Sequence, residues 1–233
     1  MKSWYDVYLE EIKLKKNAKN YIEDKIKHKR IFIKMLKKYS SSSKKMIEAG
    51  CGTGIISAYM ANIGYNVTGI DIDKNIIQLA KKISNEYFDV KKNNILFQEK
   101  NIFNLNYKDK EFDVCFSNGV LEHFKDEEIV ETLQQQIRIS NYVLVGIPTQ
   151  FFDKSEALHG DERFLPIDYW RYLITKSGGR IIEEKNFHYM NTIEKILNFK
   201  KRLGRPKPFR LFIIEELWWE SINVLYLMLV IHL

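Results

Sequence analysis

From Lys44 onward, short apolar runs alternate with stretches whose apolar positions recur at helical spacing. The runs have the length of buried strands, and the stretches between them are long enough for crossover helices. Strands alternating with helices favour right-handed crossovers and a parallel sheet covered on both faces. We therefore predict a doubly wound, mostly parallel α/β sheet of about seven strands. The predicted strands of this core are residues 46–49, 66–70, 95–98, 112–117 and 142–147, and its helices are residues 55–63, 74–86 and 126–137.

The segment before this core has a different pattern. Apolar residues recur there at helical spacing with lysines between them, which predicts one amphipathic helix over residues 16–38. A shorter helix is expected over Trp4–Leu14, and the serine run Ser40–Ser43 is typical of a linker. We accordingly predict an N-terminal helical arm or lid over residues 1–43, followed by one domain over residues 44–233.

After Pro148 the alternation weakens. A loop over 149–165, a helix over 167–177 and a strand over 180–187 are expected first. A late helical insertion is then predicted near residues 189–208, with a last strand over 209–214. The terminal residues 221–233 are almost wholly apolar but too short to span a bilayer alone. We predict a packed helix for them, with an interfacial anchor as the alternative.

Composition narrows the class of protein. In 233 residues, 45% are hydrophobic and 29% charged, which is typical of folded globular proteins and excludes fibrous and disordered classes. Two cysteines far apart, with no signal segment, suit a reducing, cytoplasmic location. The net charge of +7 comes from residues 1–45, which hold 14 Lys+Arg against 5 Asp+Glu. A second basic run covers residues 195–210. Such runs attract phosphates or anionic lipid, although a solvated helix face is the simpler reading.

The most informative segment is Glu48–Gly54, where a short apolar strand leads through three glycines into a helix. Glycines there let the backbone turn sharply and let a ligand lie against it. A dinucleotide fingerprint would need glycine at Ile55, and a phosphate-binding loop would need a lysine after Gly54. About twenty residues later the second strand ends at Asp71, whose carboxylate can bind both ribose hydroxyls. The pattern therefore indicates a nucleoside-like ligand without a required pyrophosphate.

With these motifs the sequence resembles the class I S-adenosylmethionine-dependent methyltransferases, over roughly residues 44–187. The resemblance rests on EAGCGTG at 48–54, GIDID at 69–73 and FDVCFSNGVLEHF at 112–124, in this order and spacing. It implies a Rossmann-like fold, S-adenosylmethionine as cofactor and S-adenosylhomocysteine as product. A small-molecule methyltransferase is the type that it resembles most.

The resemblance also implies which residues hold the cofactor. The glycine loop would pass under the methionine part, Glu48 would support that loop, and Asp71 would bind the ribose. Asn101 stands where the family usually has Asp, and its carbonyl oxygen can still pair with the adenine amine. The implied cofactor-binding residues are Glu48, Gly50, Cys51, Gly52, Gly54, Asp71, Ile72, Asn101, Ile102, Ser117, Asn118 and Gly119.

Other polar residues near these motifs have structural interpretations. Asp73 is placed to cap the next helix, and Asp113 to brace the loop at the start of a strand. Cys51 lacks a paired His or second Cys, which argues against redox or nucleophilic chemistry. The five histidines are scattered, and no cluster has zinc-ligand spacing, so no metal is expected.

Methyl transfer from a sulfonium is an in-line displacement in which the enzyme mainly aligns the acceptor and excludes water. A hydroxyl or ammonium acceptor must also lose a proton, and histidine is the natural base. His123 and His159 are the two candidates, with packing or loop anchoring as the alternative for each. Residues of the arm and of the late insertion would then choose the acceptor: Trp4, Tyr5, Tyr8, Tyr21 and residues 191–203.

Four other functions stay open at this point. A methyltransferase acting on RNA or protein would use the basic segments, although the sequence has no aromatic and basic RNA module. A membrane-embedded acceptor would be reached through peripheral contact of the apolar terminus. A non-catalytic protein could bind the same cofactor. A nicotinamide-dependent oxidoreductase is disfavoured by Ile55 at the third glycine position.

Overall fold

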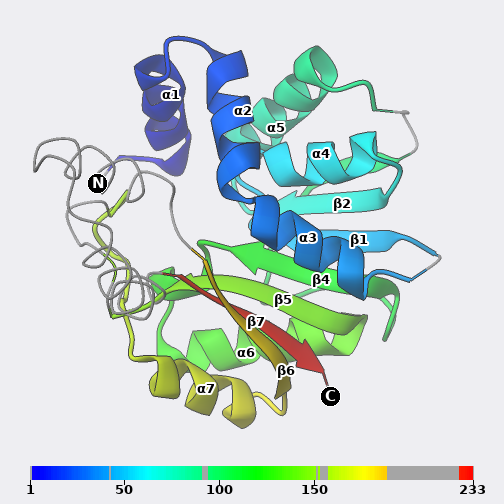
Figure 1. Cartoon of the computed structure of the whole chain (residues 1–233), viewed down its shortest axis with the longest axis vertical. Helices are drawn as coiled ribbons and strands as arrows, with labels where there is room; N and C mark the ends of the chain where they lie inside the picture. The colour runs from blue at the N-terminus through cyan, green and yellow to red at the C-terminus, as the bar shows by residue number, and fades with distance from the viewer. Residues whose placement is uncertain are drawn as a thin grey trace, which may run out of the picture.

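A seven-stranded sheet forms the centre of the molecule in a computed structural model (Figure 1). The structure describes residues 2–41, 43–90, 94–150, 152, 157–187 and 226–232. The strand order is β3-β2-β1-β4-β5-β7-β6, and only β7 runs antiparallel to its neighbours. The predicted doubly wound, mostly parallel sheet is confirmed. Its strands are β1 (Lys45–Ala49), β2 (Asn66–Asp71), β3 (Ile95–Glu99), β4 (Phe112–Asn118), β5 (Ser140–Pro148), β6 (Arg180–Phe187) and β7 (Tyr226–His232).

Helices cover both faces of this sheet. On one face, Ile47 of β1 and Cys115 of β4 pack in an apolar cluster with α6 and α7. On the other face, Met46 and Phe116 of the same strands pack with α3 and α4 (Figure 1). Because successive strand residues face opposite sides and both sides are buried, these strands read as unbroken apolar runs. The helices are α1 (Trp4–Leu14), α2 (Ala18–His28), α3 (Arg30–Tyr39), α4 (Ile55–Asn62), α5 (Lys74–Tyr87), the short 3-10 helix η1 (Leu121–His123), α6 (Asp126–Ile139) and α7 (Ile167–Lys176).

The serine run between α3 and β1 is tied to the sheet. Asp113, near the start of β4, accepts hydrogen bonds from Ser41 Oγ at 2.6 Å, Ser43 Oγ at 2.7 Å and the backbone N–H of Lys45 at 3.0 Å. This is the bracing role predicted for Asp113. The run does connect the arm helices to β1, while a domain boundary at residue 43 stays a prediction.

The prediction of one helix over residues 16–38 is wrong. The helix is interrupted at Lys29, which is both the C-cap of α2 and the N-cap of α3 and has φ −92° and ψ 10°. The reason is that the two halves bury their apolar faces against different partners. Tyr21 and Ile22 of α2 pack with Ile55 of α4, whereas Phe32 of α3 packs against Phe116 in the sheet. Since the apolar spacing continues through the break, periodicity alone could not show it.

The packed helix predicted over residues 221–233 is also wrong, because residues 226–232 form β7. This strand lies between β5 and β6 and pairs with both. The sheet needs a strand at this place to pair the backbone groups of β5 and β6. The predicted helical insertion near 189–208 and the strand over 209–214 lie outside the described residues. No helix in the described part of the chain has both the length and the apolar character needed to cross a bilayer.

Candidate active site

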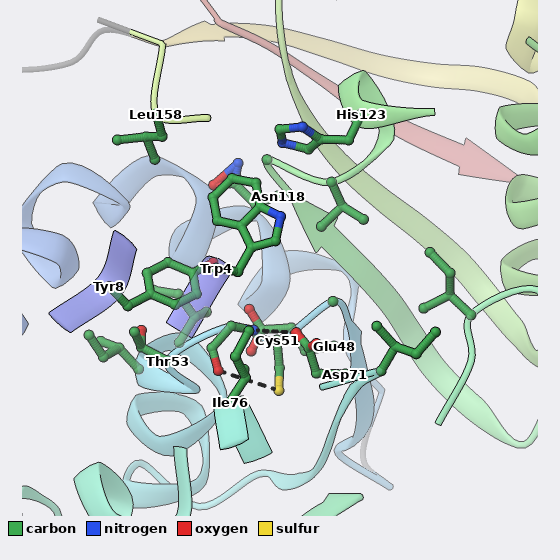
Figure 2. Close-up of a pocket in the computed structure, with 18 of the residues that line it drawn as sticks. Trp4, Tyr8, Glu48, Cys51, Thr53, Asp71, Ile76, Asn118, His123 and Leu158 are labelled. Carbon is green, nitrogen blue, oxygen red and sulfur yellow. Dashed lines mark hydrogen bonds between the residues drawn. The ribbon is translucent and has the colours of Figure 1, made fainter. Parts of the chain in front are cut away.

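A cavity of about 450 Å³ lies at the end of the sheet where β1, β2 and β4 end. Its lining combines the loop after β1 with Trp4 and Tyr8 of α1 and Tyr21 of α2. In Figure 2, Asp71 lies at one end of the cavity and His123 at the other, with Trp4 between them. Ligands of open α/β sheets bind at this place, beyond the carboxyl ends of the strands.

Two glycines of the loop after β1 shape the cavity floor. Gly50 has φ +70° and Gly52 has φ +51°, a region that side chains disfavour. A Cβ on Gly50 would lie 2.7 Å from Val120, and one on Gly52 would lie 2.6 Å from the Tyr8 hydroxyl. Glycine is therefore required at both positions. Gly54 has a different environment, because its Cβ would meet Phe97 and Ala80, and it does not line the cavity.

Asp71 joins the end of β2 to the glycine loop. Its Oδ2 accepts a hydrogen bond from Gly52 N and its Oδ1 accepts one from Asp73 N, both at 3.1 Å. Each oxygen keeps a further lone pair, so the carboxylate can still accept from ribose hydroxyls. Burial raises the pKa of Asp71, and the two backbone hydrogen bonds oppose that rise. Asp73 itself caps α5 by accepting from Asn75 N at 2.7 Å, as predicted.

The residues predicted to contact adenine lie beside Asp71. Ile72 lines the cavity with 68% of its surface exposed, which is unusual for a large apolar side chain and fits a stacking surface. Ile102 and Asn101 also line the cavity. The Asn101 carbonyl oxygen already accepts from Phe103 N at 2.9 Å, so pairing with an adenine amine would use its second lone pair.

Asn118 and Gly119 form the cavity wall next to Val120. Asn118 Nδ2 donates to the Gly146 carbonyl at 3.3 Å, and the Gly119 N–H donates to the same oxygen at 3.0 Å. Asn118 Oδ1 is buried, and none of the described residues donates a hydrogen bond to it. A buried acceptor without a partner destabilises the fold unless a ligand or water pairs with it. It thus fits an ammonium group of a bound ligand. Ser117 is buried outside the cavity lining.

Two buried carboxyls, Glu48 and Glu122, and the half-buried Lys29 line the same cavity. Burial raises the pKa of Glu48 to about 8 and that of Glu122 to about 8, so both carboxyls hold a proton at neutral pH. Glu48 Oε2 accepts from the Ser57 N–H at 3.1 Å and from Ser57 Oγ at 2.5 Å, which ties β1 to α4. Lys29, at the break between α2 and α3, has its pKa lowered to about 7, mainly by burial.

The two predicted histidines meet at one carboxylate. His123 Nδ1 lies 2.7 Å from Asp161 Oδ1, and His159 Nδ1 lies 3.4 Å from the same oxygen. The Trp4 ring stacks on His159 with centroids 4.6 Å apart and meets His123 edge-on at 5.0 Å. We refer to these four residues as the His–Asp cluster. Of the two histidines, only His123 lines the cavity.

The His–Asp cluster also bears on metal binding. His123, Asp161 and Glu162 offer ligand atoms within 4.8 Å of one another, the only such group of three in the part of the chain that the structure describes. The expectation that no metal is bound stays a prediction.

The cavity gathers most of the predicted cofactor residues, except Gly54 and Ser117. It also contains residues that sequence reasoning gave no role in the site: Lys29, Glu122, Phe124 and Leu158. Glu122 had a signal, since it is an acidic residue in the apolar run VLEHF. Lys29 had none, because it is one lysine among many and the helix break that places it was not expected.

The sheet order, the glycine floor and Asp71 define a nucleoside-binding, Rossmann-like α/β protein. Residues 47–139, from β1 to the end of α6, match a family model described as a methyltransferase domain. This match agrees with the predicted resemblance to the class I S-adenosylmethionine-dependent methyltransferases over the part of the chain from β1 to α6.

The alignments with curated relatives cover only part of this chain and part of each relative. A ubiquinone biosynthesis O-methyltransferase from Pasteurella multocida is 31% identical over 109 residues, which are 44% of this chain and 45% of that protein. One of the same name from Pelagibacter ubique is 36% identical over 83 residues, covering 35% of this chain and 32% of that protein. The chain thus spans less than half the length of these two relatives. One from Coxiella burnetii is 24% identical over 164 residues, covering 63% and 68%.

Solved structures share the fold at low sequence identity. Magnesium protoporphyrin IX methyltransferase from Synechocystis, solved with bound S-adenosylmethionine, has a TM-score of 0.60 and 14% identity and covers 91% of this chain and 80% of its own. The cyclase SpnF has a TM-score of 0.61 and 14% identity, covering 86% and 79%. At this identity the likeness shows the fold alone.

Proposed function

We propose that the chain binds S-adenosylmethionine in the cavity and transfers its methyl group to a small-molecule acceptor, leaving S-adenosylhomocysteine. One observation carries the proposal: the floor of Gly50 and Gly52, tied to Asp71, opens into the same cavity as His123. A cofactor site and a candidate base therefore face one enclosed space. The match of residues 47–139 to a methyltransferase domain supports the reaction class.

Different residues bind different parts of the cofactor. Asp71 accepts from the ribose hydroxyls, Ile72 lies against adenine, and Asn118 Oδ1 accepts from the ammonium of the methionine part. The bound cofactor supplies a methyl carbon already activated by its sulfonium. The protein's task is then to align the acceptor and to exclude water, which the overlying Trp4 and Tyr8 of α1 assist.

The cavity lining favours an apolar acceptor that carries a ring. Trp4 and Leu158 lie near His123 in Figure 2, and Phe103 and Phe124, which pack edge to face, also line the cavity. Aromatic side chains bind flat apolar rings well, and a histidine at their edge suits an acceptor with an ionisable hydroxyl. The O-methyltransferase names of the relatives from Pasteurella multocida and Pelagibacter ubique agree with this acceptor class.

Transfer of a labelled methyl group tests the proposal. The wild type is incubated with methyl-labelled S-adenosylmethionine and a cell extract, which is then separated into small molecules, lipids, RNA and protein. We expect label in the small-molecule fraction, and at least a tenfold loss with Asp71→Ala. Label found only in RNA, protein or membrane lipid would overturn the proposed acceptor class. Cofactor binding without any labelled product would favour a non-catalytic protein.

A further inference from the structure

The His–Asp cluster joins segments far apart in the chain. Trp4 comes from α1, His123 from η1 after β4, and His159 and Asp161 from the loop before α7. Burial would raise the pKa of Asp161, but the hydrogen bond from His123, together with smaller contributions, outweighs burial, and the pKa lies below its ordinary value. One carboxylate therefore serves two imidazole rings, and the surroundings of those rings differ.

One ring nitrogen of His159 makes a hydrogen bond, and the other is buried without a hydrogen-bond partner among the described residues. Its Nε2 lies 3.0 Å from the Lys2 carbonyl oxygen, an acceptor, so this nitrogen carries the proton and donates. Its Nδ1 faces Asp161, and its ring face is covered by Trp4. No nitrogen of His159 is left for a substrate. What His159 does hold is the start of the arm, through Lys2 and Trp4.

His123 differs from His159 in which ring nitrogen makes its hydrogen bond to the protein. Its Nδ1 lies 2.7 Å from Asp161 Oδ1, so Nδ1 carries the proton and the carboxylate accepts it. That tautomer leaves Nε2 with a free lone pair, since within the described residues the ring of His123 makes its hydrogen bond through Nδ1. Because His123 lines the cavity, the lone pair can meet a ligand there.

We propose that Asp161 is the positioning residue that makes His123 a general base, and that His159 is a structural residue that fixes α1 over the cavity. The inference rests on the proposed methyl transfer and assigns different roles to the two histidines. It also names the acceptor's reacting group as a hydroxyl. The aromatic lining beside His123 makes a phenol the fitting class.

His123 Nε2 takes the proton of the acceptor hydroxyl, and the acceptor oxygen forms a bond to the methyl carbon. The carbon–sulfur bond breaks, and its electron pair returns to sulfur. The imidazolium, stabilised by Asp161, then releases its proton to water. Other titratable groups around His123 are Glu162 and His159 in the same loop as Asp161, and Glu122 next to it in η1, with Lys29 of the arm facing Glu122.

Imidazole tautomers test the assignment directly, without turnover. Nitrogen-15 histidine spectra of the protein with S-adenosylhomocysteine, at a pH where the rings are neutral, report which nitrogen holds each proton. His123→Gln and His159→Gln assign the signals. We expect the Nδ1–H form for His123 and the Nε2–H form for His159. Asp161→Ala should return His123 to the Nε2–H form common in solution, while the exposed control Asp168→Ala should change neither ring. An Nε2–H form of His123 in the wild type would overturn the proposal.

Kinetics supply the second readout, with catechol as the probe acceptor. We expect His123→Gln to lower kcat by about 10²–10⁴ and Asp161→Ala by at least about tenfold. The double variant should lose no more than His123→Gln alone, because Asp161 acts through that ring. His159→Gln should raise KM and leave kcat within about threefold.

Other outcomes would contradict these roles. Additive losses in the double variant, or a large loss of kcat in His159→Gln, would overturn them. So would activity that a chelator removes and Mg²⁺ restores, because a metal would then occupy His123. Absence of methyl transfer in the wild type would refute the proposed function, while the tautomers would still decide whether Asp161 orients His123.

Discussion

Glu48 and Glu122 are buried carboxyls that line the cavity at the carboxyl end of the sheet. The stability that a buried, protonated carboxyl contributes is fully present only below its pKa in the unfolded chain, where the folded and the unfolded protein both hold the proton. Between the ordinary pKa of 4.5 and the folded value of about 8, unfolding releases a proton from Glu48. The free energy of unfolding therefore falls as pH rises through this interval, by about 1.4 kcal/mol per pH unit for each such group.

Glu48→Gln is expected to remove one of these protons. Between pH 5 and 7, its free energy of unfolding should fall less steeply than that of the wild type, by about 1.4 kcal/mol per pH unit. Lys29 changes the slope mainly above pH 7, because its pKa in the folded protein is lowered to about 7 and it is protonated in both states at lower pH. Urea unfolding at pH 5, 6 and 7 measures the slopes. Equal slopes for the two proteins would mean that Glu48 is ionised in the fold.

At Gly52, the backbone conformation and the space that a ligand needs both favour glycine. Gly52→Ala places a methyl group 2.6 Å from the Tyr8 hydroxyl, at the cavity floor, and adds about 1 kcal/mol of backbone strain. We expect binding of S-adenosylhomocysteine to weaken at least tenfold. Gly64→Ala is the matched control, since it has φ +99° with nothing within 4 Å of its Cβ. Its melting temperature should drop similarly while binding stays unchanged; equal binding by both variants would count against the proposed floor.

At the scale of elements, apolar pattern predicted most helices and strands to within a residue or two, because each run is bounded by a turn or a cap. The apolar pattern failed where the packing partner of a segment determines its structure. The break at Lys29 exists because α2 packs on α4 and α3 packs on the sheet. The almost wholly apolar run at the end of the chain has no period that separates helix from strand, and the pairing with β5 and β6 makes residues 226–232 the strand β7.

The place of β7 inside the sheet gives an element-scale prediction. Ile231 of β7 is fully buried, and its Cγ2 would lie 2.4 Å from a Cβ on Gly179. Ile231→Asp buries an unpaired carboxylate and should lower the free energy of unfolding by about 4 kcal/mol or more. Ile182→Asp on the neighbouring β6, where the isoleucine is 39% exposed, should cost under about 1 kcal/mol. Urea unfolding that finds similar small losses would show that residues 226–232 are not an inner strand.

At the scale of the whole molecule, the cofactor half of the site could be predicted and the acceptor half could not. Gly50, Gly52 and Asp71 follow consecutive strands, so their meeting is a consequence of the parallel sheet. The contact of Trp4 with His159 joins residues 155 positions apart through the packing of the arm, which no local pattern encodes. For the same reason Asp161 could be seen as a loop charge but not as the partner of His123.

The central claim is that this cavity binds S-adenosylmethionine, and calorimetric titration tests it most directly. The wild type is titrated with S-adenosylmethionine, S-adenosylhomocysteine and nicotinamide dinucleotides, beside Asp71→Ala and the capping control Asp73→Ala. We predict micromolar affinity for the two sulfur nucleosides, at least a tenfold loss in Asp71→Ala and no loss in Asp73→Ala. No binding, or a preference for a dinucleotide, would contradict the account and every site assignment built on the glycine floor.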